Sequence, residues 1–118
     1  MKQHLNPDQT AKLIELGFEK PSNMVYTQVA KRKIGFGIIE WEDSGEEGSY
    51  SIGELISFCP TTINVGDDEF AAFEVYWDSI GWRADYHIFG HMYHLAMATE
   101  LIDCLFELVV KLKEEGVI

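Results

Sequence analysis

The sequence predicts a two-layer α+β fold, in which a mainly antiparallel sheet of four to five strands packs against a long C-terminal helix and two shorter helices. Apolar residues recur every three or four positions from Met92 to Glu115, which is the spacing of one helix face. Three segments between Thr61 and Ile88 have strand patterns and are joined by turns too short for parallel crossovers. We treat residues 1–118 as a single domain, because 118 residues is a common domain size.

Capping signals mark the two shorter helices. Each signal is an N-cap side chain with a glutamine or glutamate three residues later: Asn6 with Gln9, and Ser51 with Glu54. The first helix is predicted from Leu5 to Phe18, with Gly17 as its stop. The second begins at Ser51 and ends before Pro60, which cannot continue a helix.

The remaining stretches are less defined. Met24 to Glu42 has strand patterns and forms either one long bent strand or a hairpin that turns at Lys31 to Lys33. Asp43 to Ser49 has no apolar residue and is predicted to be a mobile, acidic loop. Phe89 to His91 is predicted to lead into the final helix, which Gly116 ends.

The charge limits the classes of partner. Nine basic and twenty acidic residues give a net charge of −11, which repels DNA and anionic membranes, so we expect no direct nucleic-acid or membrane partner. Cys59 and Cys104 do not make a disulfide framework. With no secretion signal and no apolar run of about 18 residues, the sequence predicts a cytoplasmic location.

Three stretches carry a resemblance: NPDQTAKLIELGFEKP at Asn6 to Pro21, YSIGELISFCP at Tyr50 to Pro60, and ELIDCLFELVVKLKEEG at Glu100 to Gly116. They resemble a family of small acidic proteins of unknown function, encoded by gut Bacteroides-type bacteria and by their phages and mobile elements. These motifs are structural, so the resemblance implies no catalytic residue. The histidine-rich stretch Ala84 to His94 departs from the family's acidic entry to the last helix.

Three histidines are the candidate metal ligands: His87, His91 and His94, with Asp85 nearby. Imidazole and carboxylate groups are ligands for zinc. His91 and His94 share a helix face if the final helix has begun by His91. The spacing matches no strong zinc signature, and the favoured interpretation is that these histidines cap, turn or lie exposed. We therefore expect no cofactor.

Aromatic residues are the candidate partner surface. Six of them could lie on an open sheet face: Tyr26, Trp41, Tyr76, Trp77, Trp82 and Tyr86. Base stacking on such a face normally needs basic neighbours, so packing is the better interpretation in this acidic chain. Tyr76 and Tyr86 could instead contact a partner. Phe106 and Leu108 lie near the edge of the apolar arc of the final helix and could join them.

The leading hypothesis is a non-enzymatic protein-interaction module, such as an accessory protein of a phage or mobile element, with an unidentified protein partner. The alternatives are a histidine-based metal-binding protein or metal-dependent enzyme, and an acidic mimic of nucleic acid. The sequence has no G-x-S-x-G elbow, no phosphate-binding glycine loop and no C-x-x-C pair. A homodimer that tightens as salt rises is a further expectation, because an apolar patch favours pairing once salt screens the charge.

Overall fold

The fold was obtained as a computed structural model, which describes residues 3–19, 21, 24–35 and 38–118, with side chains for residues 3–19, 21 and 49–118. The elements follow in the order α1 (Pro7–Glu15), β1 (Met24–Gly35), β2 (Ile38–Gly48), α2 (Ile52–Phe58), β3 (Thr62–Gly66), β4 (Glu69–Trp77), β5 (Trp82–Ile88), β6 (His91–Ala98) and α3 (Leu101–Glu114). Strands β3, β4, β5 and β6 form one antiparallel sheet in that order. The α+β fold predicted from the sequence is confirmed.

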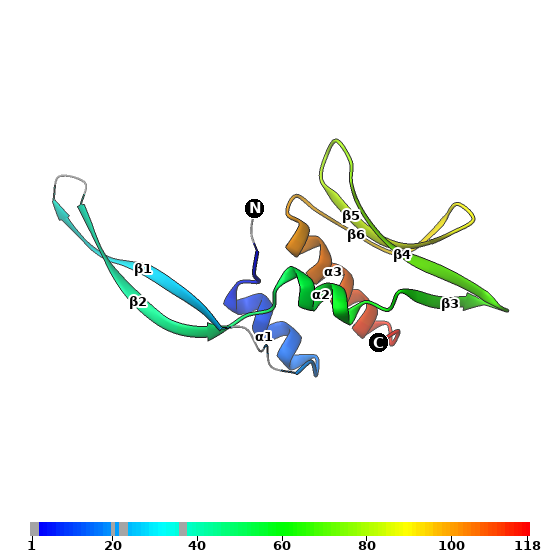
Figure 1. Cartoon of the computed structure of the whole chain (residues 1–118), viewed down its shortest axis with the longest axis horizontal. Coiled ribbons are helices and arrows are strands. Elements are labelled where there is room, and N and C mark those ends of the chain that lie inside the picture. The colour runs from blue at the N-terminus through cyan, green and yellow to red at the C-terminus, as the bar shows by residue number, and fades with distance from the viewer. Residues whose placement is uncertain (1–2, 20, 22–23, 36–37) are drawn as a thin grey trace.

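The helices lie together on one side of this sheet (Figure 1). Helix α3 packs on β5 and β6, and α2 packs on α3. Helix α1 lies beside α3, where the Gln9 amide donates a hydrogen bond to Asp103 at 2.8 Å and Lys12 pairs with Glu114 at 3.7 Å. The β1–β2 ribbon extends away from the sheet and the helices (Figure 1).

Both predicted capping boxes are present. The side chain of Asn6 accepts a hydrogen bond from the backbone N–H of Gln9 at 2.8 Å, and that of Ser51 accepts one from Glu54 at 3.2 Å. The side chains of Gln9 and Glu54 accept hydrogen bonds from the two N-cap backbones in return. Two backbone donors are thereby satisfied at the start of each helix, as the sequence predicts.

The core lies between the helices and the sheet. Its largest fully buried apolar side chains are Tyr50, Tyr86, Leu13, Leu55, Ile102, Leu105, Leu108, Leu112 and Val109. Leu105 is among them and lies where α3 meets the sheet. The C-terminal stop is also confirmed: Gly116 has φ 76°, and the N–H of Val117 donates to the carbonyl of Leu112 at 2.8 Å.

The start of the final helix is corrected by the structure. His91–Ala98 forms strand β6, and the helix begins only at Leu101. Phe89 and Gly90 have φ values of 47° and 80°, so they form a two-residue hairpin turn that sends the chain back along β5. The predicted helix stripe includes β6 residues because a short apolar stretch fits both the helix and the strand period.

The segment before α2 is also corrected. It is a hairpin, but β1 runs through Lys31 to Lys33, and the strands are joined between Gly35 and Ile38. The acidic stretch expected to be a loop belongs largely to β2, with Asp43 opposite Gln28 and Gly48 opposite Met24. Backbone hydrogen bonds hold such a ribbon, so β2 does not require apolar residues there.

Candidate interaction surface

Within the part of the chain that the structure describes, helices pack on one face of the four-stranded sheet and leave the other face without a helix (Figure 1). On the opposite face, Ala71, Ala84 and Tyr86 are fully buried beneath the helical layer. Successive residues of a strand point to opposite faces, so the neighbours of these three point away from the helices. This helix-free side is called the outer face below, and from β4, β5 and β6 it includes Phe70, Ala72, Glu74, Tyr76, Arg83, Asp85, His87, Met92 and Met97.

Large apolar side chains are exposed on the outer face. Phe70 is 53% exposed, Met92 50% and Met97 46%. A sheet face in contact with water normally carries polar residues. Contiguous exposed apolar surface on a small protein instead marks a contact surface. The outer face therefore has the composition of a partner-binding surface.

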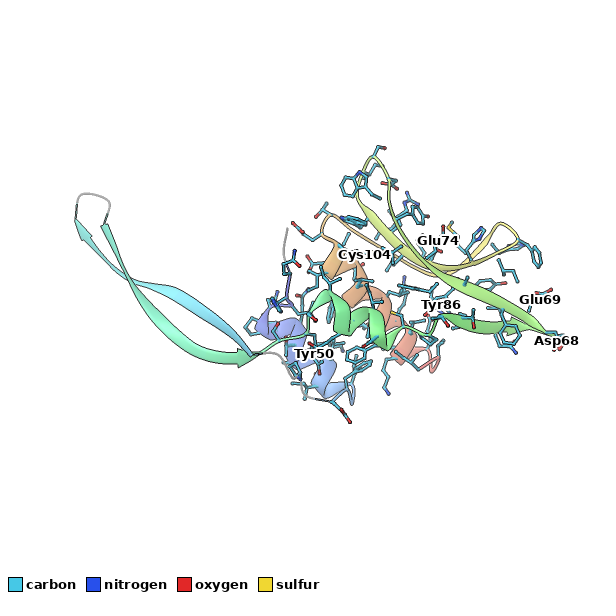
Figure 2. The ribbon with its side chains drawn as sticks, viewed as in Figure 1. Tyr50, Asp68, Glu69, Glu74, Tyr86 and Cys104 are labelled. Carbon is cyan, nitrogen blue, oxygen red and sulfur yellow. The ribbon has the colours of Figure 1, made fainter. Side chains whose placement is uncertain are left out.

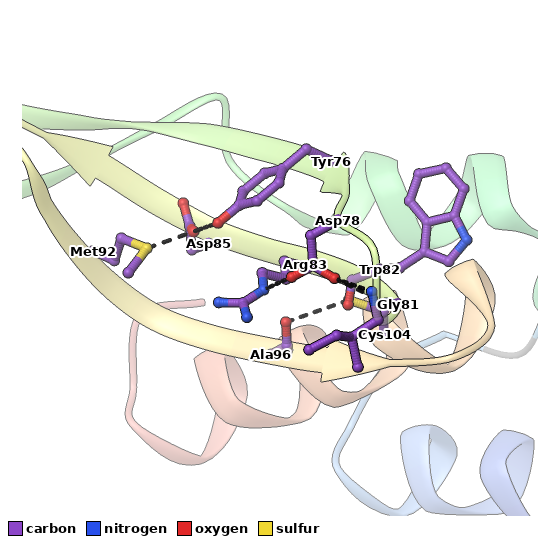
Figure 3. A network of polar contacts seen from close by, with 10 residues as sticks. Tyr76, Asp78, Gly81, Trp82, Arg83, Asp85, Met92, Ala96 and Cys104 are labelled. Atoms are coloured by element: carbon purple, nitrogen blue, oxygen red, sulfur yellow. Dashed lines mark hydrogen bonds and ion pairs between the residues drawn. The ribbon is translucent and has the colours of Figure 1, made fainter.

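Asp85 lies in the middle of the outer face, yet its side chain is fully buried. The hydroxyl of Tyr76 donates to Asp85 Oδ2 at 3.5 Å and lies 3.9 Å from the sulfur of Met92 (Figure 3). Among the described residues, no donor reaches the other oxygen, Oδ1. Glu74 is directly opposite on β4. A buried carboxyl group with a free oxygen thus faces a second carboxyl group.

The surroundings of Asp85 raise its affinity for protons. Burial raises the pKa of Asp85, and the charge of Glu74 and a hydrogen bond between the two side chains raise it further. His87 and the Tyr76 hydroxyl act in the opposite direction, because both favour the ionised carboxylate. Burial, followed by the charge of Asp85, also raises the pKa of Tyr76. Asp85 therefore holds its proton more tightly than an exposed aspartate does.

Arg83 also lies on the outer face, but its guanidinium is paired with Asp78 (Figure 3). Asp78 accepts two further hydrogen bonds, from the backbone N–H groups of Ile80 at 2.8 Å and Gly81 at 2.9 Å. These backbone bonds, together with Arg83, hold the pKa of Asp78 below its usual range. The guanidinium of Arg83 is therefore held mainly by Asp78, and it also interacts with the hydroxyl of Tyr76.

A small cavity of about 220 Å³ adjoins the outer face where β4 turns into β5. Ile80, Trp82, Arg83 and Met97 contribute to its walls. Trp77 packs edge-on against Trp82, with ring centroids 5.6 Å apart. Because the side chains of Trp77 and Ile80 are exposed, the apolar surface continues from Met97 around this end of the sheet.

The three histidines predicted as metal ligands do not come together. His87 is exposed on the outer face, and His91 is exposed at the first position of β6. His94 lies at a bulge in β6 with φ 58°, and its Nδ1 pairs with the carboxylate of Glu115 at the end of α3. Within the described part of the chain, no group of three or more His, Cys, Asp or Glu side chains is placed to hold a metal ion. The shared helix face expected for His91 and His94 does not exist, because both are strand residues.

A second, more open cleft of about 590 Å³ lies beside His94. Its other walls include Asn64 from β3, Tyr93 from β6 and Val117 from the C-terminal tail. The bulge directs the His94 side chain toward α3, as bulges commonly re-aim a side chain. The contact with Glu115 then ties the end of α3 to the sheet, which is a structural role.

Two of the residues that the sequence suggested for a partner surface, Tyr86 and Leu108, are fully buried. Tyr86 faces the helices, and its hydroxyl donates to the carbonyl of Pro60 at 2.7 Å. Leu108 is fully buried, because α3 has other elements on both sides. Phe106 is partly buried against the core, whereas Tyr76 lies on the outer face. The side chains of Tyr26 and Trp41 lie outside the described residues.

Both cysteines are buried and free (Figure 2 labels Cys104). Burial raises the pKa of Cys59 to about 12 and that of Cys104 to about 11. The thiol of Cys104 donates to the carbonyls of Ala96 at 3.4 Å and Trp82 at 3.6 Å (Figure 3). Thiols with such raised pKa values are inert at neutral pH, so these two pack as small apolar residues.

Comparisons with known protein families, with curated proteins and with solved structures find no match for this chain. No helix in the described ranges is both long and apolar enough to cross a membrane.

Proposed function

We propose that the protein is a non-enzymatic interaction module, and that its outer face binds the surface of a basic protein. The observation that carries the proposal is the composition of this face: exposed Phe70, Met92 and Met97 surround the carboxyl groups of Glu74 and Asp85. Apolar side chains supply the burial that drives association, and the acidic centre selects for positive charge.

The net charge of −11 supports a basic partner over a second copy of the chain. Two copies repel each other, whereas a basic protein is attracted and reaches the surface faster. The outer face presents apolar groups around a small acidic centre rather than a row of carboxylates. That composition favours a protein partner over the imitation of nucleic acid. The segments that resemble phage and mobile-element proteins are consistent with an accessory role.

A random-peptide display selection against the intact protein tests this proposal. We expect enriched peptides to combine arginine or lysine with apolar residues. We expect the double variant Phe70→Glu/Met97→Glu to bind them at least about tenfold more weakly, because one large apolar side chain contributes roughly 1.5–3 kcal/mol when buried. The matched control is Ile14→Glu/Ile56→Glu, which adds the same charge at exposed positions on α1 and α2.

Two results would contradict the proposal. Selected peptides could bind the outer-face variant as strongly as the parent protein, or could show no excess of basic residues over the starting library. The first outcome would show that the peptides do not bind at the outer face. The second would show that the partner is not selected for positive charge.

A further inference from the structure

The centre of the outer face contains an unusual arrangement of charge. Asp85 is fully buried, and its Oδ1 has no hydrogen-bond donor among the described side chains and backbone groups. Buried polar atoms in folded proteins almost always have a partner. Glu74, which interacts with Asp85 by charge and by a hydrogen bond, is acidic as well. A donor that carries positive charge would satisfy the free oxygen and offset the charge of both carboxyl groups.

Among the described residues, no cationic group bonds to Asp85 Oδ1. Arg83 is paired with Asp78 and also interacts with the Tyr76 hydroxyl, and His87 acts on Asp85 through its charge without a hydrogen bond to it. The acidic pair is thus left without a cation bonded to its free oxygen. This arrangement suits a group that arrives from outside the chain.

The side chains of Tyr76 and Met92 lie beside the carboxyl group of Asp85 (Figure 3). The Tyr76 hydroxyl bonds to Asp85 and contacts the sulfur of Met92, and Met92 is 50% exposed (Figure 3). Methionine is unbranched and adapts its shape easily. A change in the Met92 side-chain conformation would open the approach to Asp85 without any change in the backbone, and Glu74 is already exposed. The register of β5 against β6 also shifts opposite Asp85, where the bulge interrupts regular pairing.

We propose that Glu74, Tyr76, Asp85 and Met92 form a socket that receives one arginine side chain of the partner. The inference rests on the proposed function, since the arginine belongs to the protein bound at the outer face. A guanidinium is planar and offers several N–H donors, so it can bond to both carboxyl groups at once. It is also less strongly hydrated than an ammonium group and stacks on aromatic rings, which matches the ring of Tyr76.

The socket is tested with a small probe and the intact protein. Nα-acetyl-arginine methylamide is titrated against protein labelled with ¹³C at its methionine methyl groups, and the Met92 signal is assigned with Met92→Leu. We expect a saturable shift of the Met92 signal with a dissociation constant on the order of millimolar, as for a small ligand held by one ion pair. The citrulline equivalent, which has the same shape and no charge, should give no saturable shift.

Three variants separate the socket from general acidity. Glu74→Gln and Asp85→Asn should each weaken the arginine response about tenfold or more. Glu69→Gln removes an exposed carboxylate at the start of β4, outside the socket, and should leave the response unchanged. Glu74 is exposed, so its variant tests the proposal even if Asp85→Asn perturbs the sheet.

The pH dependence gives an independent readout, because arginine binds an ionised Asp85 more strongly than a protonated one. Binding should strengthen as pH rises from acidic to neutral, and less steeply in Asp85→Asn. The other groups that act on the pair are Tyr76 from β4, Arg83 and His87 from β5, and, from the far side of the sheet, Cys104 of α3. Of these, His87 acts on Asp85 through its charge, and His87→Gln controls for it.

The outcomes distinguish this inference from the function on which it rests. Equal shifts with arginine and citrulline, or an arginine response that survives Glu74→Gln, overturn the socket. If the selected peptides need the outer face but bind equally well after their arginines are replaced, the socket is wrong and the interaction surface stands. If arginine binds in the socket but the peptides ignore the outer face, the socket stands and the proposed function fails.

Discussion

The two faces of the four-stranded sheet are built from the same strands but have opposite surroundings. On the helix-covered face, Ala84 and Tyr86 are fully buried in an apolar core. On the outer face, the residue between them, Asp85, is equally buried but has carboxyl, hydroxyl and thioether neighbours. The difference shows that burial alone does not define a core. The helix-covered face stabilises the fold through its buried apolar residues. The outer face instead has a buried polar centre, Asp85, with exposed apolar side chains around it, a composition that suits a binding surface.

The largest effect is expected on the covered side. Leu105 is fully buried where α3 meets the sheet, so Leu105→Ala should lower the free energy of unfolding by roughly 2–5 kcal/mol through lost burial and a residual cavity. Urea denaturation followed by circular dichroism measures this loss. Met97→Ala on the outer face is the matched control, and a similar loss there would remove the distinction between the faces.

The next effect concerns Asp85, whose pKa is raised in the folded protein. Folding then binds a proton, so the contribution of Asp85 to stability is complete below the unfolded-state pKa of about 3.9 and is lost as pH rises through the folded-state pKa. Asp85→Asn should raise the free energy of unfolding at pH 7 by about 1–3 kcal/mol, because a buried carboxylate no longer forms.

Thermal melts of the parent and Asp85→Asn between acidic and neutral pH check this sign. The two stability curves should approach each other at low pH and separate as pH rises. Parallel curves would show that Asp85 ionises in the folded protein as easily as in the unfolded chain. Glu69→Gln, which removes an exposed carboxylate, should leave the slope close to that of the parent.

A smaller effect is expected in the helical layer that creates the covered face. Ser51 caps α2 by accepting a hydrogen bond from the N–H of Glu54, so Ser51→Ala should cost about 0.5–2 kcal/mol. Equilibrium denaturation measures it. Ser57→Ala lies on the same helix away from the cap, and a loss no larger in Ser51→Ala than in this control would contradict the role of the cap.

The smallest effect on stability is expected on the outer face itself. Met97→Glu should change the free energy of unfolding by no more than about 0.5 kcal/mol, because the side chain is already 46% exposed. Its effect should appear in binding to the selected basic peptides instead. A loss of stability as large as that of Leu105→Ala would mean that the outer face is part of the core.

The sequence predicted correctly those features that depend on residues close together in the chain. The caps at Asn6 and Ser51 and the stop at Gly116 depend on residues within one helical turn, and all three are present. The stretch His91–Ala98 could not be assigned in this way, because its apolar residues fit both periods. Pairing with β5, a contact between separate strands, decides its conformation.

The candidate site could be predicted only in part. Alternation along Trp82–Ile88 separates Tyr86 from Asp85 and His87, and the alternation itself indicates that the more polar set faces away from the core. That signal would have placed Tyr86 inside. The pairing of Asp85 with Glu74 could not be read from the chain, because it depends on the register between β4 and β5. Which polar residues face one another across two strands is determined only when the sheet assembles.

The bulge at His94 has a consequence for self-assembly. Strand β6 is an edge strand, and a straight, unpaired edge is a template on which further strands can add without limit. With His94 in a left-handed conformation, the spacing of N–H and carbonyl groups along β6 is broken, and an incoming strand loses its register at that point. The bulge therefore makes the β6 edge of the sheet resistant to strand addition, while the apolar outer face remains exposed to water.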